Sequence, residues 1–225
     1  METFDWLPFL KQWSEEMLDV AEYVDDLPQE AVETRWLGFP GATEEQIKEA
    51  EERLGTVFPP SYRAFLKVSN GWRQPDAFWP SNAGSLWSTE QVEWFSVRNQ
   101  DWIDSYLNPF QEGILRTVPD DEYFVYGAAQ DCALSLRVEY LQTILEISDT
   151  GDGVYLLNPK VVGDGGEWEA WFFANWNPGA DRYRSFWEMM QAHYHSWQNY
   201  LPLLKGEMSE EEYNSYAGRM DVKNV

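Results

Sequence analysis

The sequence predicts an α+β domain with a central antiparallel sheet, flanked by N-terminal helices and a C-terminal helix. Three observations support this fold class. Apolar residues recur every three to four positions near both ends of the chain, which is the period of an amphipathic helix. Short runs rich in aromatic and β-branched residues lie between those ends. Because these runs do not alternate with helical segments, we do not expect the crossover connections of a parallel sheet.

The first predicted helix spans residues 5–24 and is followed by a connector. The apolar positions of the helix are Trp6, Leu10, Trp13 and Met17. Their spacing of three to four residues places them on one helical face. Residues 25–35 are acidic and contain Pro28, so we interpret them as the connector.

The clearest local signals predict two short helices joined by a proline-marked turn. Thr43 is a good N-cap, and Gln46 three residues later completes a capping box. Gly55 suits the left-handed position that follows a helix end. Pro60 opens the second helix, because proline at the first helical position loses no needed N–H group. Gly71, preceded by asparagine, ends this segment.

The middle of the chain predicts the sheet. Residues 72–94 are punctuated by proline and glycine, and we expect irregular strands or long loops there. A short helix is expected at residues 99–107. The predicted strands are residues 123–126, 143–147, 154–157 and 167–174, with a turn at 149–153. Alternation in the last strand places Trp168, Ala170 and Phe172 on one side.

The last strong helical pattern runs from residue 181 to about residue 198. In the polar segment beyond it, Ser209 and Glu212 form another capping box and begin a short peripheral helix. We therefore divide the chain into an N-terminal helical extension, an α+β domain and a C-terminal polar tail, at residues 1–35, 36–200 and 201–225.

The charge of the chain restricts its partners. Thirty-nine Asp and Glu residues against 16 Lys and Arg residues give a net charge of −23. Such a field repels nucleic-acid phosphates and anionic membranes, and it attracts basic proteins. No segment approaches the roughly 18 uncharged apolar residues of a membrane span, and the N-terminus lacks the features of a signal peptide. We expect a cytoplasmic protein that binds neither nucleic acid nor membranes.

The residues that most often carry chemistry do not form a recognisable site. His193 and His195 are the only histidines, and in a helix they point about 200° apart, so they cannot share a metal. Gly151 and Gly153 stand where a calcium loop beginning at Asp149 needs oxygen ligands. Cys132 lies between short apolar and polar residues and is interpreted as a packed side chain. We expect no catalytic residue, no metal and no cofactor.

Two groups of residues are candidates for partner binding. The acidic group follows Pro119, and the alternative interpretation is a solvated face. The aromatic group lies in a loop-rich stretch where tryptophan can anchor an interface, and the alternative is a ring-rich core. The predicted partner-binding residues are Trp72, Trp79, Trp87, Asp120, Asp121 and Glu122.

Several of these segments resemble the SUKH superfamily, the Smi/Knr-type domain of fungal cell-wall regulators and bacterial immunity proteins. The first matching element comprises Pro60, Tyr62, Phe65, Leu66, Asn70 and Gly71. The second comprises Gly151, Asp152, Tyr155, Leu156 and Asn158, and Phe186 fits the start of the third. The resemblance covers about residues 36–195. It implies an α+β domain with a central antiparallel sheet, and it implies that many bacterial members neutralise a toxin by binding it.

Three functional hypotheses follow. The first is a non-catalytic immunity protein that covers a basic toxin domain, such as a nuclease, with acidic residues that mimic phosphates. The second is a regulatory scaffold in cell-wall synthesis or stress signalling, as the fungal relatives imply. The third is a hydrolase that uses two carboxylates, which predicts a deep cleft containing both. With 39 acidic residues in the chain, sequence alone cannot identify such a pair.

Overall fold

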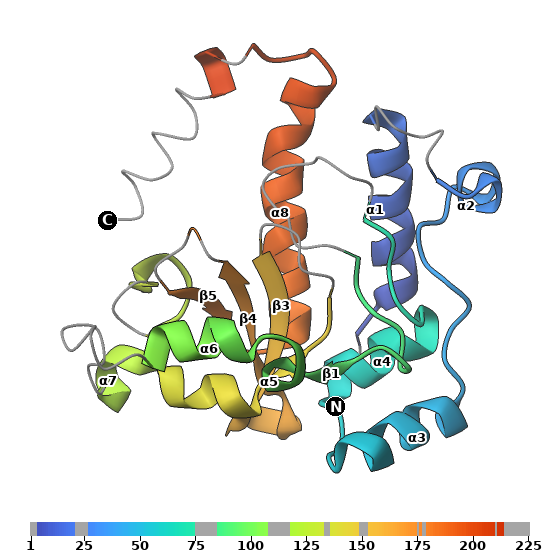
Figure 1. Ribbon diagram of the computed structural model, residues 1–225. Helices are drawn as coiled ribbons and strands as arrows, with labels where there is room; N and C mark the ends of the chain where they lie inside the picture. The colour runs from blue at the N-terminus through green and yellow to red at the C-terminus, as the bar shows by residue number, and fades with distance from the viewer. Residues whose placement is uncertain are drawn as a thin grey trace.

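The computed structural model describes residues 4–20, 27–74, 85–107, 118–132, 136–148, 153–174, 176, 179–209 and 211–213. It confirms the α+β fold (Figure 1), with helices around one antiparallel sheet of five strands in the order β1-β2-β3-β4-β5. The strands are β1 Glu93–Trp94, β2 Leu145–Glu146, β3 Gly153–Val162, β4 Trp168–Ala174 and β5 Ala180–Tyr183. Each strand pairs with the next one along the chain, so the sheet is a meander.

The α-helices are α1 Trp6–Val20, α2 Gln29–Thr34, α3 Glu44–Leu54, α4 Pro60–Val68, α5 Phe95–Arg98, α6 Gln100–Leu107, α7 Asp120–Tyr123 and α8 Phe186–Leu204. Short 3₁₀ turns are η3 Gly127–Ala129, η4 Val138–Thr143 and η5 Asp164–Gly166. In the described part of the chain, no helix is long and apolar enough to cross a membrane.

The local signals that predicted α3 and α4 are confirmed. Thr43 Oγ1 accepts a hydrogen bond from the backbone N–H of Gln46, and the Gln46 side chain accepts one from the N–H of Thr43. This reciprocal pair satisfies N–H groups that have no partner inside the helix. Gly55 follows α3 with a φ of 67°, in the left-handed region. α4 begins at Pro60, as predicted.

The sheet is buried on both faces. Along β4, Trp168, Ala170 and Phe172 pack into a cluster with residues of α1, α4 and α8. The alternate residues Trp171 and Phe173 pack into a second cluster with residues of α5, α6 and η4. The predicted alternation of β4 is therefore correct, and helical layers cover both sides of the sheet.

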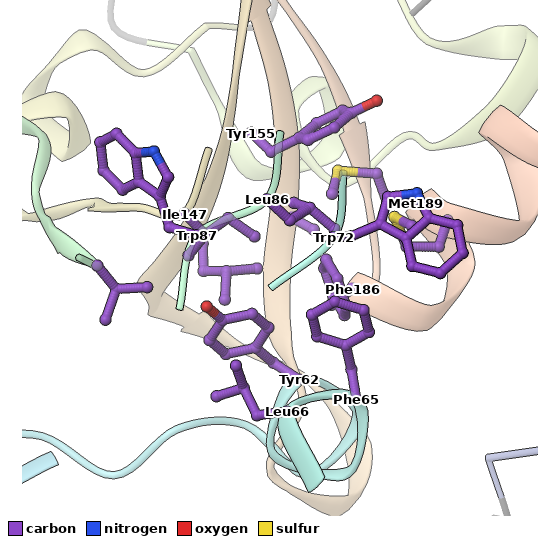
Figure 2. Close-up of a cluster of buried hydrophobic side chains, with 14 of the residues drawn as sticks. Tyr62, Phe65, Leu66, Trp72, Leu86, Trp87, Ile147, Tyr155, Phe186 and Met189 are labelled. Carbon is purple, nitrogen blue, oxygen red and sulfur yellow. The ribbon is translucent and has the colours of Figure 1, made fainter. Parts of the chain in front are cut away.

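The main core joins α4, α8 and the sheet, and Figure 2 shows its centre. Tyr62, Phe65 and Phe186 meet there with ring centroids 5.1–6.1 Å apart. Trp72 and Trp87 lie in the same cluster and are buried. These rings supply the large apolar area that holds the helices on this face of the sheet.

Three predictions about individual elements were wrong. The expected strand at residues 123–126 is instead the end of α7 and a turn leading to η3. Residues 181–183, which were placed in the last helix, belong to β5. α8 begins only after Ser185, whose hydroxyl accepts the Glu188 N–H. The expected connector at 25–35 contains α2. In each case the outcome depends on packing or capping that the apolar pattern does not encode. The predicted turn at 149–153 lies outside the described residues except for Gly153.

Candidate functional site

A charged pair is buried at the β4–β5 edge of the sheet. Glu169 on β4 and Arg182 on β5 are 1% exposed, and Arg182 Nη1 lies 3.0 Å from Glu169 Oε1. Trp171 pairs with Arg182 across the two strands, so the register brings the pair together. Burying two charges is costly unless each is paired and hydrogen-bonded.

Neutral donors complete the shell of the Glu169 carboxylate. The hydroxyls of Tyr123 and Tyr126 donate to its oxygens at 2.6 and 2.9 Å. Asn158 Nδ2 and Trp171 Nε1 donate to Oε2 at 3.0 and 2.7 Å. With Arg182, the carboxylate therefore accepts from five side chains. Such saturation gives the Glu169 carboxyl group a structural role, because its oxygens are already occupied by donors from the fold.

The two tyrosines are held in their protonated form. Burial, and then the charge of Glu169, raise the pKa of Tyr123 and of Tyr126 well above the usual value. Both phenols therefore remain hydrogen-bond donors at neutral pH. The Arg182 guanidinium also stacks 4.0 Å from the Tyr123 ring centroid, a cation–π contact.

A second buried carboxylate connects the sheet to α4. Glu167, just before β4, accepts hydrogen bonds from the backbone N–H and the hydroxyl of Ser61 at 2.7 and 2.5 Å. Ser61 lies in the first turn of α4, where N–H groups lack helical partners. The Glu167 carboxylate therefore caps α4. It is two residues before Glu169 in the chain.

A groove of about 660 Å³ opens above these two carboxylates. It is lined by residues of the β3 end, η5, the start of β4, the start of α8 and the segment after α7. Phe124 and Val162 form exposed apolar parts of the wall, at 47% and 57% exposure. The charged side chains of the wall are Asp164, Arg184 and Glu188, with Glu167 and Glu169 also among the lining residues.

The predicted acidic residues precede the groove residue Phe124 in the chain and do not themselves line the groove. Asp120, Asp121 and Glu122 form the exposed first turn of α7, and Phe124 follows that helix directly. Asp120 pairs with Arg137 Nη2 at 2.6 Å, although its own side chain remains largely exposed. The structure thus places an acidic turn and an apolar groove wall within a few residues of each other.

The predicted aromatic residues do not join that surface. Trp72 and Trp87 are buried in the main core, where Trp72 packs on Trp13 and Trp36 and the Trp87 ring stacks with Arg98. A buried ring cannot contact a partner without a change in the core. The positions of Trp72 and Trp87 therefore fit the alternative interpretation, in which these rings belong to the core. Trp79 lies outside the described residues.

No described residues assemble a metal site. No group of three or more His, Cys, Asp or Glu in the described ranges has the geometry to hold a metal ion. Cys132 Sγ donates to Asp181 Oδ1 at 2.7 Å, and burial together with this carboxylate raises the pKa of the thiol to about 12. The thiol is therefore protonated at neutral pH and is a poor nucleophile.

His193 on α8 is buried among the rings of Tyr155, Phe172 and Tyr183, whereas His195 is exposed. Burial lowers the pKa of His193 from its usual value of 6.5 to about 4. Between these two values the unfolded chain binds a proton that the folded chain does not. The free energy of unfolding should therefore fall as the pH decreases through this window, by up to about 3 kcal/mol.

The variant His193→Phe tests this pH dependence. It keeps a ring in the pocket and removes the imidazole, which is the group that takes up a proton on unfolding. As the pH falls from 6.5 to 4, the unfolding free energy of the variant should therefore decrease less than that of the wild type. His195→Phe, at an exposed position, is the matched control and should leave the pH dependence of the unfolding free energy as it is in the wild type. Urea unfolding at several pH values measures this dependence for each protein. The same pH dependence in the wild type and in His193→Phe would contradict the assignment.

A sequence model of the SMI1 / KNR4 family (SUKH-1) matches residues 41–192, more than half of the chain. The chain belongs to this family. A comparison with curated proteins gave no match. Members of the SUKH family are in general non-catalytic immunity or regulatory proteins, and the family is linked to protein partners.

Several of the described residues that carried the SUKH resemblance have structural roles. Tyr62 and Phe186 lie in the main core, and Gly71 adopts a φ of 104°. Asn70 Oδ1 accepts the Thr89 N–H at 2.8 Å. Asn158 donates to Glu169, so one family residue also supports the buried charged network. The match begins at residue 41, just before α3, so α1 and α2 of this SUKH-1 chain lie outside it.

Sequence reasoning missed Glu169, Arg182 and the groove. One signal was present, because Glu169 is a charged residue inside an otherwise apolar strand. Such a residue must find a partner if the strand is buried. Nothing in the sequence near Arg182 marks it as that partner, since the pairing depends on the β4–β5 register.

Proposed function

We propose that this SUKH-1 protein is an immunity protein that neutralises a basic toxin domain by one-to-one binding. In this mechanism the protein covers the active or substrate-binding surface of the toxin, and no covalent bond is made or broken. The observation that carries the proposal is the net charge of −23. A basic nuclease domain has the opposite charge, because it binds phosphates. Family membership supports a protein-binding role in general.

The acidic turn of α7 is the proposed point of first contact. Asp120, Asp121 and Glu122 are exposed and adjacent in the chain. Carboxylates presented in this way attract a basic surface over about 8 Å at physiological salt, which raises the association rate more than the final affinity. The exposed Phe124 that follows supplies apolar contact area once the two proteins meet.

The first experiment is an affinity purification of the tagged protein, with the product of the adjacent gene co-expressed. The proposal predicts a one-to-one complex with a protein that is lethal alone and harmless in the presence of this chain. Recovery of only envelope or signalling proteins would instead support a regulatory scaffold. Recovery of no protein at low salt would overturn a protein-binding function.

The role of α7 is tested by the association rate with that partner. Neutralising the turn with Asp120→Asn, Asp121→Asn and Glu122→Gln should slow association about tenfold at low salt. The matched control neutralises three exposed residues of α3, with Glu45→Gln, Glu49→Gln and Glu52→Gln. Both variants change the net charge equally, so only a local role separates them. Equal rates for the two variants would contradict the assignment of α7.

A further inference from the structure

We propose that the groove between η5 and the start of α8 is a receptor for an arginine side chain of the protein partner. This inference rests on the proposed function for the existence of a partner, and it names the part of that partner that the surface binds. Its volume of about 660 Å³ is in the range of sites that enclose a ligand group, and an arginine side chain fits with space for flanking residues.

The lining residues favour a cation. Asp164, Glu167, Glu169 and Glu188 contribute four carboxylates, whereas Arg184 is the basic residue of the lining. Glu169 is neutralised from below by Arg182, and Glu167 is hydrogen-bonded to Ser61. Asp164 is exposed and Glu188 is partly exposed, and in the described part of the chain Asp164 has no ion-pair partner. A positive group entering the groove therefore gains charge pairs without removing any that hold the fold.

Arg184 shows which cation this groove recognises. Its guanidinium lies 4.9 Å from the Tyr126 ring centroid and donates from Nη1 to Glu188 Oε1 at 2.7 Å. An aromatic face beside a carboxylate is the environment that binds a planar guanidinium by stacking and charged hydrogen bonds. The Arg184 side chain is 63% exposed, so this pair contributes little to stability and can be exchanged.

The exchange explains why arginine is the proposed occupant. An incoming guanidinium takes the place of Arg184 between Tyr126 and Glu188, and Asp164 supplies a second carboxylate. Arg184 then turns into solvent, which its exposure permits. A lysine ammonium is more strongly hydrated and lacks the planar face that stacks on Tyr126, so it should bind less well.

The test uses peptides and does not require the partner to be known. The probes are acetyl-Gly-Gly-Arg-Gly-Gly-amide, the same peptide with lysine, and the same peptide with citrulline, a neutral isostere of arginine. Chemical-shift titration of the isotope-labelled full chain measures each dissociation constant and locates the site. We expect the arginine peptide to shift signals of Gly163, Asp164 and residues 184–188. It should bind at least about tenfold more tightly than the citrulline peptide.

Variants separate the groove from general acidity. Asp164→Asn with Glu188→Gln should weaken the arginine peptide about tenfold. Arg184→Gln should tighten binding a few-fold, because the competing guanidinium is removed. The control Glu90→Gln removes an exposed carboxylate at a different cavity and should change nothing. Equal binding of citrulline or lysine peptides, no effect of the double variant, or weaker binding by Arg184→Gln would each overturn the proposal.

The outcome is distinguishable from that of the proposed function. If the groove binds the arginine peptide but no toxin partner is found, the receptor stands and the immunity role fails. If a toxin is neutralised equally by wild type and by the Asp164→Asn, Glu188→Gln variant, the immunity role stands and the groove is not its arginine receptor.

Discussion

Replacing Arg182 by methionine should lower the free energy of unfolding by about 3–5 kcal/mol. The substitution leaves the Glu169 carboxylate buried and charged without its cation. The hydroxyls of Tyr123 and Tyr126 remain as donors, but neutral donors do not supply the missing charge. Methionine keeps much of the side-chain volume, so the loss reports electrostatics more than packing.

Arg184→Met is the matched control, because it removes the same group two residues further along the chain. The Arg184–Glu188 pair is exposed and should contribute less than about 1 kcal/mol. Urea unfolding measures the loss of unfolding free energy in each variant, and the dependence of that free energy on urea concentration should be the same in both. A loss below about 1 kcal/mol for Arg182→Met, or equal losses for the two variants, would show that Glu169 does not depend on its cation.

A double variant tests the pairing itself. Glu169→Gln combined with Arg182→Met removes both charges. If the two residues act as a unit, the double variant should lose less unfolding free energy than the sum of the losses in the two single variants. Strict additivity would mean that each residue is held by other contacts and that the 3.0 Å pair carries no coupling. Glu169 also lines the groove, so the same pair connects the core of the sheet with the groove wall.

The sequence could predict features that depend on neighbours along the chain. The capping box of Thr43 and Gln46 and the left-handed Gly55 are local, so the bounds of α3 follow from residue types alone. The two faces of β4 follow from a period of two. The α+β class was confirmed because both kinds of local pattern were present and separated along the chain.

Features that depend on tertiary contacts could not be predicted. β5 is a short edge strand whose residues continue into the pattern of α8, and only its pairing with β4 distinguishes it. Exposure is a second example, since Trp72 and Trp87 look like the other tryptophans in sequence but pack in the core. The groove is a third, because its lining residues come from four separate stretches of the chain, within 124–126, 161–164, 167–169 and 184–191.

Replacing Trp6 by alanine should cost about 3–5 kcal/mol, although α1 lies outside the residues matched by the family. The Trp6 ring is buried against Phe65 and Phe186 at 5.4 Å and against Trp187 at 4.6 Å. Its indole N–H also donates to the Ser61 carbonyl at 3.0 Å. Figure 1 shows α1 running alongside α8, so this one side chain connects the N-terminal helix to α4 and α8.

The control is Leu7→Ala on the same helix, where the side chain is exposed and the expected loss is below about 0.5 kcal/mol. The form of the transition matters as much as its midpoint. If α1 folds with the sheet, Trp6→Ala shifts one cooperative unfolding transition. If residues 1–35 are a separate extension, unfolding followed by far-UV circular dichroism and by tryptophan fluorescence should show two transitions. Because Trp187 lines the groove and packs on Trp6, one cooperative transition would mean that α1 also supports the proposed binding surface.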